Sequence, residues 1–135
     1  MTFIDAAAIV SILAKEPEAS RCAAAILAAR APFTSAIAVW EAVIALTRKD
    51  TLGLPLDESS EIVRSFLRES GVELRQLPPP SEAIGLSTEA ARNYRSGRSR
   101  LNLADCFHYA CARHYGAPIL STADEFRFTD LDVVA

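Results

Sequence analysis

LNLADCFHYACARHYG, from Leu101 to Gly116, is the stretch of sequence that decides the fold. Its spacing predicts one helix, because one face collects the positions i, i+4 and i+7, namely Leu101, Asp105, His108, Ala112 and Tyr115. Most of this face is apolar or aromatic, so we expect it to pack inward. Asp105 is the exception, because a carboxylate facing a core is unfavourable unless it is paired, hydrogen-bonded or bound to a metal.

The length and amino-acid composition are those of one globular domain. We expect a single domain over residues 1–135, and the 50% hydrophobic content excludes disorder. No apolar run approaches membrane-spanning length, and the N-terminus lacks the basic region of a signal peptide. We therefore expect a cytoplasmic protein without membrane contact. Three cysteines fit a reduced compartment, and we interpret them as small apolar fillers: Cys22, Cys106 and Cys111.

Short apolar strands alternate with helices along the chain. We predict strands over residues 2–5, 33–35, 72–77, 119–121 and 131–134, and a loop over 122–130. We predict helices over 6–16, 18–30, 36–49, 58–70 and 101–116, and another from Ser81 that breaks near Gly85 or Ser87–Thr88. Asp57 is the predicted N-cap of the fourth helix, and the third helix should be largely buried. The alternation favours a three-layer α/β/α sandwich on a mostly parallel sheet of four to five strands.

Four acidic residues stand out in this arrangement. Asp5 ends the first strand and Asp124 follows the fourth, where parallel sheets bind ligands. Glu41 and Asp105 lie in strongly apolar helices. Carboxylates brought together raise one another's pKa unless a cation lies between them, and oxygen ligands favour Mg²⁺ or Mn²⁺.

Each acid also has a purely structural explanation. Asp5 is a good N-cap, Glu41 could reach an arginine, Asp105 could serve the first turn of its helix, and Asp124 could be solvated. Taken together, four separate structural roles explain the pattern less well than one shared acidic site, because two acids have apolar surroundings and two lie at the expected strand ends. Such a metal site suits phosphate chemistry.

Four segments carry a family resemblance: FIDAAAIV, TSAIAVWEAV, LNLADCFHYACA and ILSTADEFRFTD. In this order and spacing they resemble the PIN-domain ribonucleases, and within these the VapC toxins of bacterial toxin–antitoxin pairs. The resemblance covers essentially the whole chain, and its third segment is the most specific. It implies a Mg²⁺-dependent RNA endonuclease, usually a homodimer, that a cognate antitoxin holds inactive.

The resemblance also implies a site. It assigns Asp5, Glu41, Asp105 and Asp124 to an acidic cluster, with Asp5 and Asp105 as the most direct metal ligands. Ser35 matches a small polar residue that supports the site, and Thr122 is given the same role. Ala7 departs from the pattern, because many relatives carry there a hydroxyl that could orient Asp5. Ala104 and Ala123 stand where Gly is common.

A basic cluster precedes the Asp105 helix. The net charge of −3 argues against non-specific nucleic-acid binding, so RNA contact must rest on a local patch. The candidates are Arg92, Arg95, Arg98 and Arg100. A solvated helix face explains these arginines about equally well, and pairing with an acidic antitoxin is a third explanation.

Other residues receive structural roles. We interpret His108 as a packing residue, His114 as a surface residue, and Trp40 and Tyr109 as core or dimer contacts. The predicted reaction is metal-assisted hydrolysis of an RNA phosphodiester, without a nucleophilic Ser or Cys. Three alternatives remain: a phosphatase of the dehalogenase type, which would need an Asp at Ala7, an inactive RNA- or protein-binding module on the PIN scaffold, and a DNA-directed or structure-specific nuclease.

Overall fold

A single parallel sheet organises the protein. The computed structural model describes residues 1–134. Its strands are β1 (Thr2–Ile4), β2 (Pro32–Ser35), β3 (Glu73–Arg75), β4 (Ile119–Leu120) and β5 (Val133–Val134). They lie in the order β3-β2-β1-β4-β5, and every neighbouring pair is parallel. The predicted α/β class is confirmed, with five strands and no antiparallel pairing among the described residues.

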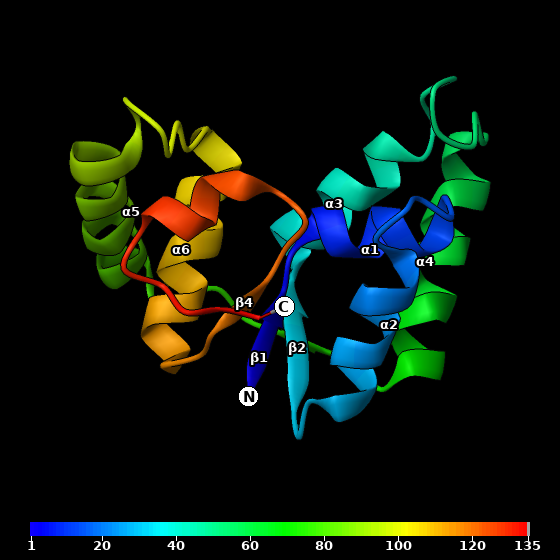
Figure 1. Cartoon of the computed structure of the whole chain (residues 1–135), viewed down its shortest axis with the longest axis horizontal. Helices are drawn as coiled ribbons and strands as arrows, with labels where there is room; N and C mark the ends of the chain where they lie inside the picture. Colours follow the sequence, from blue (N-terminus) through cyan, green and yellow to red (C-terminus); the bar gives the residue numbers. More distant parts are fainter. Residues whose placement is uncertain (135) are drawn as a thin grey trace.

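Helices cover both faces of this sheet (Figure 1). On one side lie α1 (Ala6–Leu13), α2 (Ala19–Ala28), α3 (Ala36–Ala45) and α4 (Leu56–Ser70); on the other lie α5 (Pro80–Tyr94), α6 (Leu103–Tyr115) and the 3₁₀ helix η1 (Asp124–Phe128). Neighbouring residues in a strand point to opposite faces. Accordingly Ile4 and Leu120 join the core under α1–α4, whereas Phe3 and Ile119 join the core under α5 and α6.

The decisive helix forms as its periodicity predicted. It begins at Leu103, two residues later than expected, because Asn102 caps its N-terminus and Gly116 ends it in a left-handed conformation. Leu101 precedes the helix and is still buried in the core with Ala112. The face of the helix that begins with Leu101 therefore packs inward, as expected.

Several predicted boundaries were wrong. Helix α1 ends at Leu13 rather than residue 16, since the chain turns at Lys15 with a φ of 57°. Helix α2 spans Ala19–Ala28 and not residues 18–30. Helix α3 ends at Ala45, whose carbonyl accepts a hydrogen bond from Thr51. It is also less buried than predicted, because only one of its faces meets the core and Trp40 remains 56% exposed.

The helices α4 and α5 also differ from expectation. Pro55, and not Asp57, is the N-cap of α4, and Asp57 lies in the first turn, where its charge suits the helix dipole. Helix α5 starts at Pro80, one residue early, and runs unbroken through Gly85. A glycine in a helix costs about 1 kcal/mol relative to alanine, which the packing of α5 against α6 outweighs.

The later strands are shorter than predicted. Strand β3 covers residues 73–75 at one edge of the sheet, and β5 covers only 133–134 at the other. Strand β4 ends at Leu120, which leaves Ser121 just beyond it. Part of the predicted loop over 122–130 forms η1, whose buried Phe126 packs into the core under α5 and α6.

Two further expectations concern bulk properties. The three cysteines are free and buried, as small apolar fillers should be. Among the helices that the structure describes, none combines the length and apolarity that a membrane crossing requires.

Candidate active site

The site begins at the point where the strand order reverses. From β1 the chain builds outward to β2 and β3 on one side, and β4 and β5 lie on the other. Ligands of open parallel sheets collect beyond the carboxyl ends of the strands at this switch. Asp5 follows β1 and Ser121 follows β4, so both side chains lie at the switch.

Asp5 is held by two hydrogen bonds. The backbone N–H of Ala6 donates to Oδ1 (2.8 Å), and the Ser121 hydroxyl donates to Oδ2 (2.6 Å). Ser121 in turn accepts from the N–H of Ala123 (3.0 Å). Asp5 is both N-cap of α1 and only 4% exposed, so its structural role and its place in the acidic site coincide. Burial raises the pKa of Asp5, and the nearby charge of Glu41 adds to this.

Glu41 approaches the same point from helix α3. Ser35 is the N-cap of α3 and accepts a hydrogen bond from the N–H of Ala38 (3.2 Å), which fixes the start of the helix that carries Glu41. The predicted supporting residue Ser35 thus caps the helix of Glu41, and among the described residues it makes no hydrogen bond to an acid. The Glu41 side chain is 34% exposed at the mouth of the site, and it is hydrogen-bonded to Nε2 of His108.

Asp105 comes from the first turn of α6. Its carboxylate accepts the N–H of Asn102 (3.1 Å) while the Asn102 side chain accepts the N–H of Asp105 (2.8 Å), which is a capping box. Burial is the main cause that raises the pKa of Asp105 to about 6, and the charges of Asp5 and Glu41 contribute. Asp105 therefore caps its helix and also faces the other two acids.

The fourth member of the cluster is a histidine. His108 is fully buried on α6, and its Nε2 lies 3.6 Å from Oδ1 of Asp5 as well as against Glu41. Burial alone would lower the pKa of His108, but the hydrogen bond to Glu41 and the charges of the three acids outweigh it and raise the pKa. The expectation of burial was confirmed, whereas the purely packing role was wrong.

This cluster can hold a metal ion. Ligand atoms of Asp5, Glu41 and His108 all lie within 4.8 Å of one another, and Asp105 is near enough for its charge to interact with all three. Three carboxylates facing a single imidazole, with raised pKa values for Asp5 and Asp105, form a site that a divalent cation would relieve. The carboxylate oxygens thus fit a divalent metal, and one imidazole nitrogen, that of His108, lies among them.

Asp124 lies apart from these residues. It is the first residue of η1, its side chain is 87% exposed, and the charged group nearest to it is Arg127 at 3.8 Å. The structure therefore brings together three of the four predicted acids. Thr122 lines the pocket that Glu41 also lines, while the neighbouring Ser121 makes the contact to Asp5.

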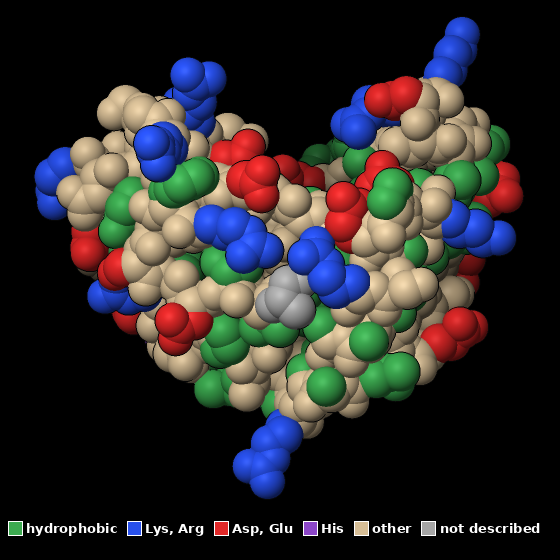
Figure 2. Space-filling model, viewed as in Figure 1, with side chains coloured by type: hydrophobic (Ala, Val, Ile, Leu, Met, Phe, Trp, Pro, Cys, Tyr) green, Lys and Arg blue, Asp and Glu red, His purple; other side chains and the backbone are tan. Residues whose placement is uncertain are grey.

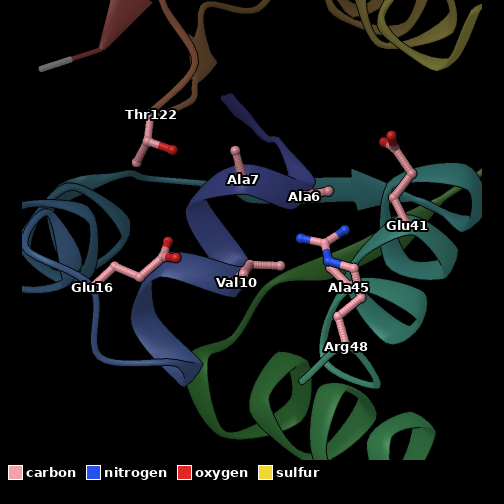
Figure 3. A pocket seen from close by; sticks show the side chains of 8 residues that line it. All are labelled: Ala6, Ala7, Val10, Glu16, Glu41, Ala45, Arg48 and Thr122. Carbon is pink, nitrogen blue, oxygen red and sulfur yellow. The ribbon is translucent and has the colours of Figure 1, made fainter. Parts of the chain in front are cut away.

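A pocket opens next to the cluster (Figure 3). Glu41 and Thr122 lie on two sides of it, the methyl group of Ala7 faces into it, and Arg48 reaches toward it from the end of α3. Ala7 has no hydroxyl to offer Asp5, and Ser121 supplies the hydrogen bond that orients Asp5. Arg48 is the positive side chain of this pocket, and it also pairs with Asp50 (3.3 Å).

The predicted basic cluster lies on the surface. All four arginines are exposed between the end of α5 and the start of α6, and within residues 1–134 none of them forms an ion pair: Arg92, Arg95, Arg98 and Arg100. Figure 2 shows a notch between the α5–α6 side and the α3–α4 side, with acidic side chains along it and basic side chains on both rims. A chain of net charge −3 thus still presents basic groups beside an acidic notch.

The sequence reasoning missed three residues: His108, Ser121 and Arg48. The helical spacing of His108, three residues after Asp105, places both side chains on one face and is a signal that could have found it. Ser121 follows a predicted strand, as Asp5 does. Arg48 lies beyond the end of α3, so helical spacing from Glu41 does not place it. The other aromatic assignments stand in part, because Tyr109 is a core residue, whereas Trp40 is exposed and its role in a dimer stays a prediction.

His114 occupies the second predicted position. It lies near the end of α6, partly exposed, and its Nδ1 is 2.8 Å from Oε1 of Glu82 on α5. It is thus a surface residue near the helix end, as predicted, and it takes no part in the acidic cluster.

The fold and the site define the class. A family model for the PIN domain matches residues 2–133, and the chain belongs to the PIN-domain family. It is 30% identical over 134 residues to VapC ribonuclease Mb0640 of Mycobacterium bovis, covering 98% of this chain and 97% of that protein. It is 33% identical over 132 residues to ribonuclease VapC36 of Mycobacterium tuberculosis, covering 96% and 90%. Within the PIN-domain family it is therefore a VapC-type protein.

A solved structure agrees on the fold. Mycobacterium tuberculosis VapC20, described as a sarcin-ricin loop cleaving toxin, superposes with a TM-score of 0.74 over 97% of this chain and 96% of that one. At 11% sequence identity this likeness concerns the fold alone. The predicted PIN-like architecture is confirmed by both kinds of comparison.

Proposed function

We propose that this chain is a divalent-metal-dependent endoribonuclease that hydrolyses RNA phosphodiester bonds. The observation that carries the proposal is the convergence of Asp5 and Glu41 with His108 at the switch point of the sheet, within range of the charge of Asp105. The ribonuclease names of its relatives support the same activity. A purely structural role would not require the buried carboxyl groups of Asp5 and Asp105, whose pKa values are raised by burial and by the charge of Glu41.

The residues of the cluster have distinct parts in the proposed reaction. Asp5, Glu41 and Asp105 would hold Mg²⁺ or Mn²⁺, with Asp5 fixed most firmly by Ala6 and Ser121. When bound, such an ion lowers the pKa of a water ligand and neutralises charge on the scissile phosphate. Asp124, at the start of η1, is proposed as an outer acid with a smaller effect, because its side chain faces solvent.

Positive side chains would position the RNA. Arg48 lines the pocket beside Glu41, where a phosphate next to the scissile bond would lie. The basic cluster from Arg92 to Arg100 would contact more distant phosphates, since its side chains are exposed and free of ion pairs within the described residues. Phosphate contacts of this kind position a nucleic acid without reading its sequence.

We infer that the biological role is that of a toxin. The VapC relatives and the toxin described for VapC20 support this, as does the length of the match. In this role the chain would act in the cytoplasm, as a homodimer, and a cognate antitoxin would hold it inactive. Co-expression with the product of the neighbouring gene, followed by co-purification, tests the partner.

The activity itself has a direct test. Purified protein should cleave RNA with Mg²⁺ or Mn²⁺ and stop when EDTA is added. Asp105→Asn should abolish cleavage and keep the fold, because asparagine still offers an oxygen to the N–H of Asn102. Asp57→Asn is the matched control, since Asp57 lies in the first turn of α4 rather than of α6. Normal cleavage by Asp105→Asn would refute this site, and a wild type that binds RNA but never cuts it would indicate a binding module.

A further inference from the structure

His108 is the residue of the cluster with no assigned role. It lies one helical turn after Asp105 on α6, it is fully buried, and its ring packs against Phe3 with a centroid distance of 5.6 Å. A packing residue could be any apolar side chain of this size. The ring instead places Nε2 against Glu41 and 3.6 Å from Asp5.

The two ring nitrogens have different surroundings. Nε2 faces carboxylate oxygens, whereas Nδ1 is buried and has no hydrogen-bond partner within residues 1–134. A hydrogen on Nε2 accounts for this contact, because an unprotonated Nε2 would face the lone pairs of the Glu41 carboxylate. A histidine that binds a metal through one nitrogen usually donates the other N–H to a second partner. Nδ1 of His108 lacks such a partner, which favours donation to Glu41 over metal ligation.

Glu41 is the acid that needs such a donor. Asp5 receives hydrogen bonds from Ala6 and Ser121, and Asp105 receives one from Asn102. Within the described residues, the Glu41 carboxylate is hydrogen-bonded only to His108, and its side chain is one third exposed at the mouth of the site. A long, partly exposed side chain with no donor would spread over several rotamers and face the cluster only part of the time.

We propose that His108 is a positioning residue, which holds the Glu41 carboxylate against Asp5 and Asp105 by donating its Nε2–H. This inference rests on the proposed metal-dependent function. The ring supplies the rigidity, because it is fully buried and packs against Phe3. His108 thereby raises metal affinity and the rate of the chemical step through Glu41, without touching the RNA.

The test replaces the ring in two ways. His108→Leu keeps an apolar side chain in the core but removes the donor, whereas His108→Gln keeps an N–H at a similar reach. We expect His108→Leu to weaken Mn²⁺ binding about tenfold in calorimetry and to lower kcat for RNA cleavage with little change in KM. His108→Gln should recover most of both losses. His114→Leu is the matched control on the same helix, and it should behave like the wild type.

A double-mutant cycle tests whether His108 acts through Glu41. In the Glu41→Gln background, His108→Leu should cost little further Mn²⁺ affinity, because the carboxylate that it positions is gone. Equal losses in both backgrounds would overturn the proposal, and so would wild-type metal affinity in His108→Leu with an intact circular dichroism spectrum. Nitrogen coupling in the pulsed EPR spectrum of bound Mn²⁺, lost in His108→Gln, would also overturn it, because it would make His108 a ligand.

Two readouts separate this inference from the proposed function. In the metal-free protein, NMR of the imidazole nitrogens should find hydrogen on Nε2 of His108, with a shift that changes in Glu41→Gln. An unprotonated Nε2 overturns the positioning role whatever the enzyme does. A wild type that binds Mn²⁺ but cleaves no RNA overturns the proposed function, while the metal affinities of His108→Leu and His108→Gln still decide the role of His108.

Discussion

Helix α6 carries two polar clusters that are balanced in different ways. The first, which we call the acid cluster, joins Asp105 and His108 of α6 to Asp5 and Glu41. The second, which we call the clamp, joins Tyr109 and Arg113 of α6 to Asp130. In the clamp Arg113 lies 2.6 Å from Asp130 and also donates to the Tyr109 hydroxyl (2.7 Å), so each charge has a partner.

The acid cluster lacks this balance. Three carboxylates share one imidazole, and the pKa of Asp5 and of Asp105 is raised in consequence of burial and mutual repulsion. A protein gains nothing in stability from such an arrangement. The comparison suggests how to tell two kinds of polar network apart. A network whose charges are paired within the protein stabilises the fold, whereas one with excess carboxylates is suited to bind a cation, even when one helix contributes to both.

The largest expected effect distinguishes the two clusters by activity. Asp5→Asn should lower RNA cleavage by at least about 10³-fold, because a metal contributes several kcal/mol to catalysis and each 1.36 kcal/mol is a factor of ten. Its melting temperature should stay the same or rise, since a buried charge is removed. Asp130→Asn should cleave within about threefold of wild type. A comparable loss of cleavage in both variants, measured on the same RNA, would erase the distinction.

The second effect concerns stability. Tyr109→Phe removes a buried hydroxyl that donates to Asp130 and accepts from Arg113, so it should cost about 1–2 kcal/mol in urea unfolding and leave cleavage unchanged. Tyr94→Phe is the matched control, because Tyr94 packs against Tyr109 with ring centroids 5.7 Å apart. If Tyr109→Phe instead lowered kcat with wild-type stability, the clamp would belong to the active site.

The third effect is the pH dependence of the acid cluster. The pKa of Asp105 is raised to about 6 in the folded protein, from an ordinary value of 3.8, so the folded chain binds more protons than the unfolded chain in this window. Stability of the metal-free protein should therefore fall as the pH rises from about 4 to 6. The raised pKa of His108 acts in the same direction above its ordinary value of 6.5.

Asp105→Asn isolates this contribution. Because Asp105 is partly exposed, solvent screening reduces the effect, and we expect the variant to lose on the order of 1 kcal/mol less unfolding free energy between pH 4 and 6 than the wild type. Thermal unfolding at several pH values, in buffer with EDTA, measures it. A slope that is equal in wild type and variant would mean that Asp105 is no more strained than a surface acid. In the wild type, Mn²⁺ at 100 times its Kd should increase the free energy of unfolding by about 2.7 kcal/mol.

The smallest expected effect concerns RNA binding by arginines that form an ion pair and by arginines that do not. Arg113 is paired, whereas Arg95 and Arg98 have no ion pair within the described residues. Arg95→Ala or Arg98→Ala should weaken RNA binding a few-fold and reduce the salt dependence of the binding constant by about one ion each. Arg68→Ala on α4, where Arg68 pairs with Glu61, should change neither. Fluorescence anisotropy at several salt concentrations measures both quantities, and equal effects at all three positions would exclude a specific RNA surface.

Much of the fold and part of the site could be predicted from local signals. An apolar run that ends in an acid predicted both β1 and the position of Asp5, and the helical period predicted that Asp105 faces inward. Boundaries were less predictable, because tertiary hydrogen bonds end the elements. Ser59, for example, donates its hydroxyl to the carbonyl of Val43, which holds α4 against α3.

The site residues that were missed depend on distant partners. His108 contacts a residue 67 positions away, and Ser121 contacts one 116 positions away. Local spacing places His108 on the same helical face as Asp105 and Ser121 after a strand, but it does not reveal which distant residue either of them contacts. Asp124 is the opposite case. Its position after β4 was predicted correctly, but η1 turns its side chain toward solvent.

By itself, the sequence determined the alternation of strands and helices, the parallel class of sheet and the identity of the acids at Asp5 and Asp105. These follow from hydrophobic periodicity and residue chemistry, which act over a few residues. Only the tertiary structure decided that Glu41 and His108 meet at the end of β1, that Ser121 anchors Asp5, and that Asp124 stays outside. Those outcomes depend on how whole elements pack, because packing alone brings side chains from separate parts of the chain within hydrogen-bonding distance.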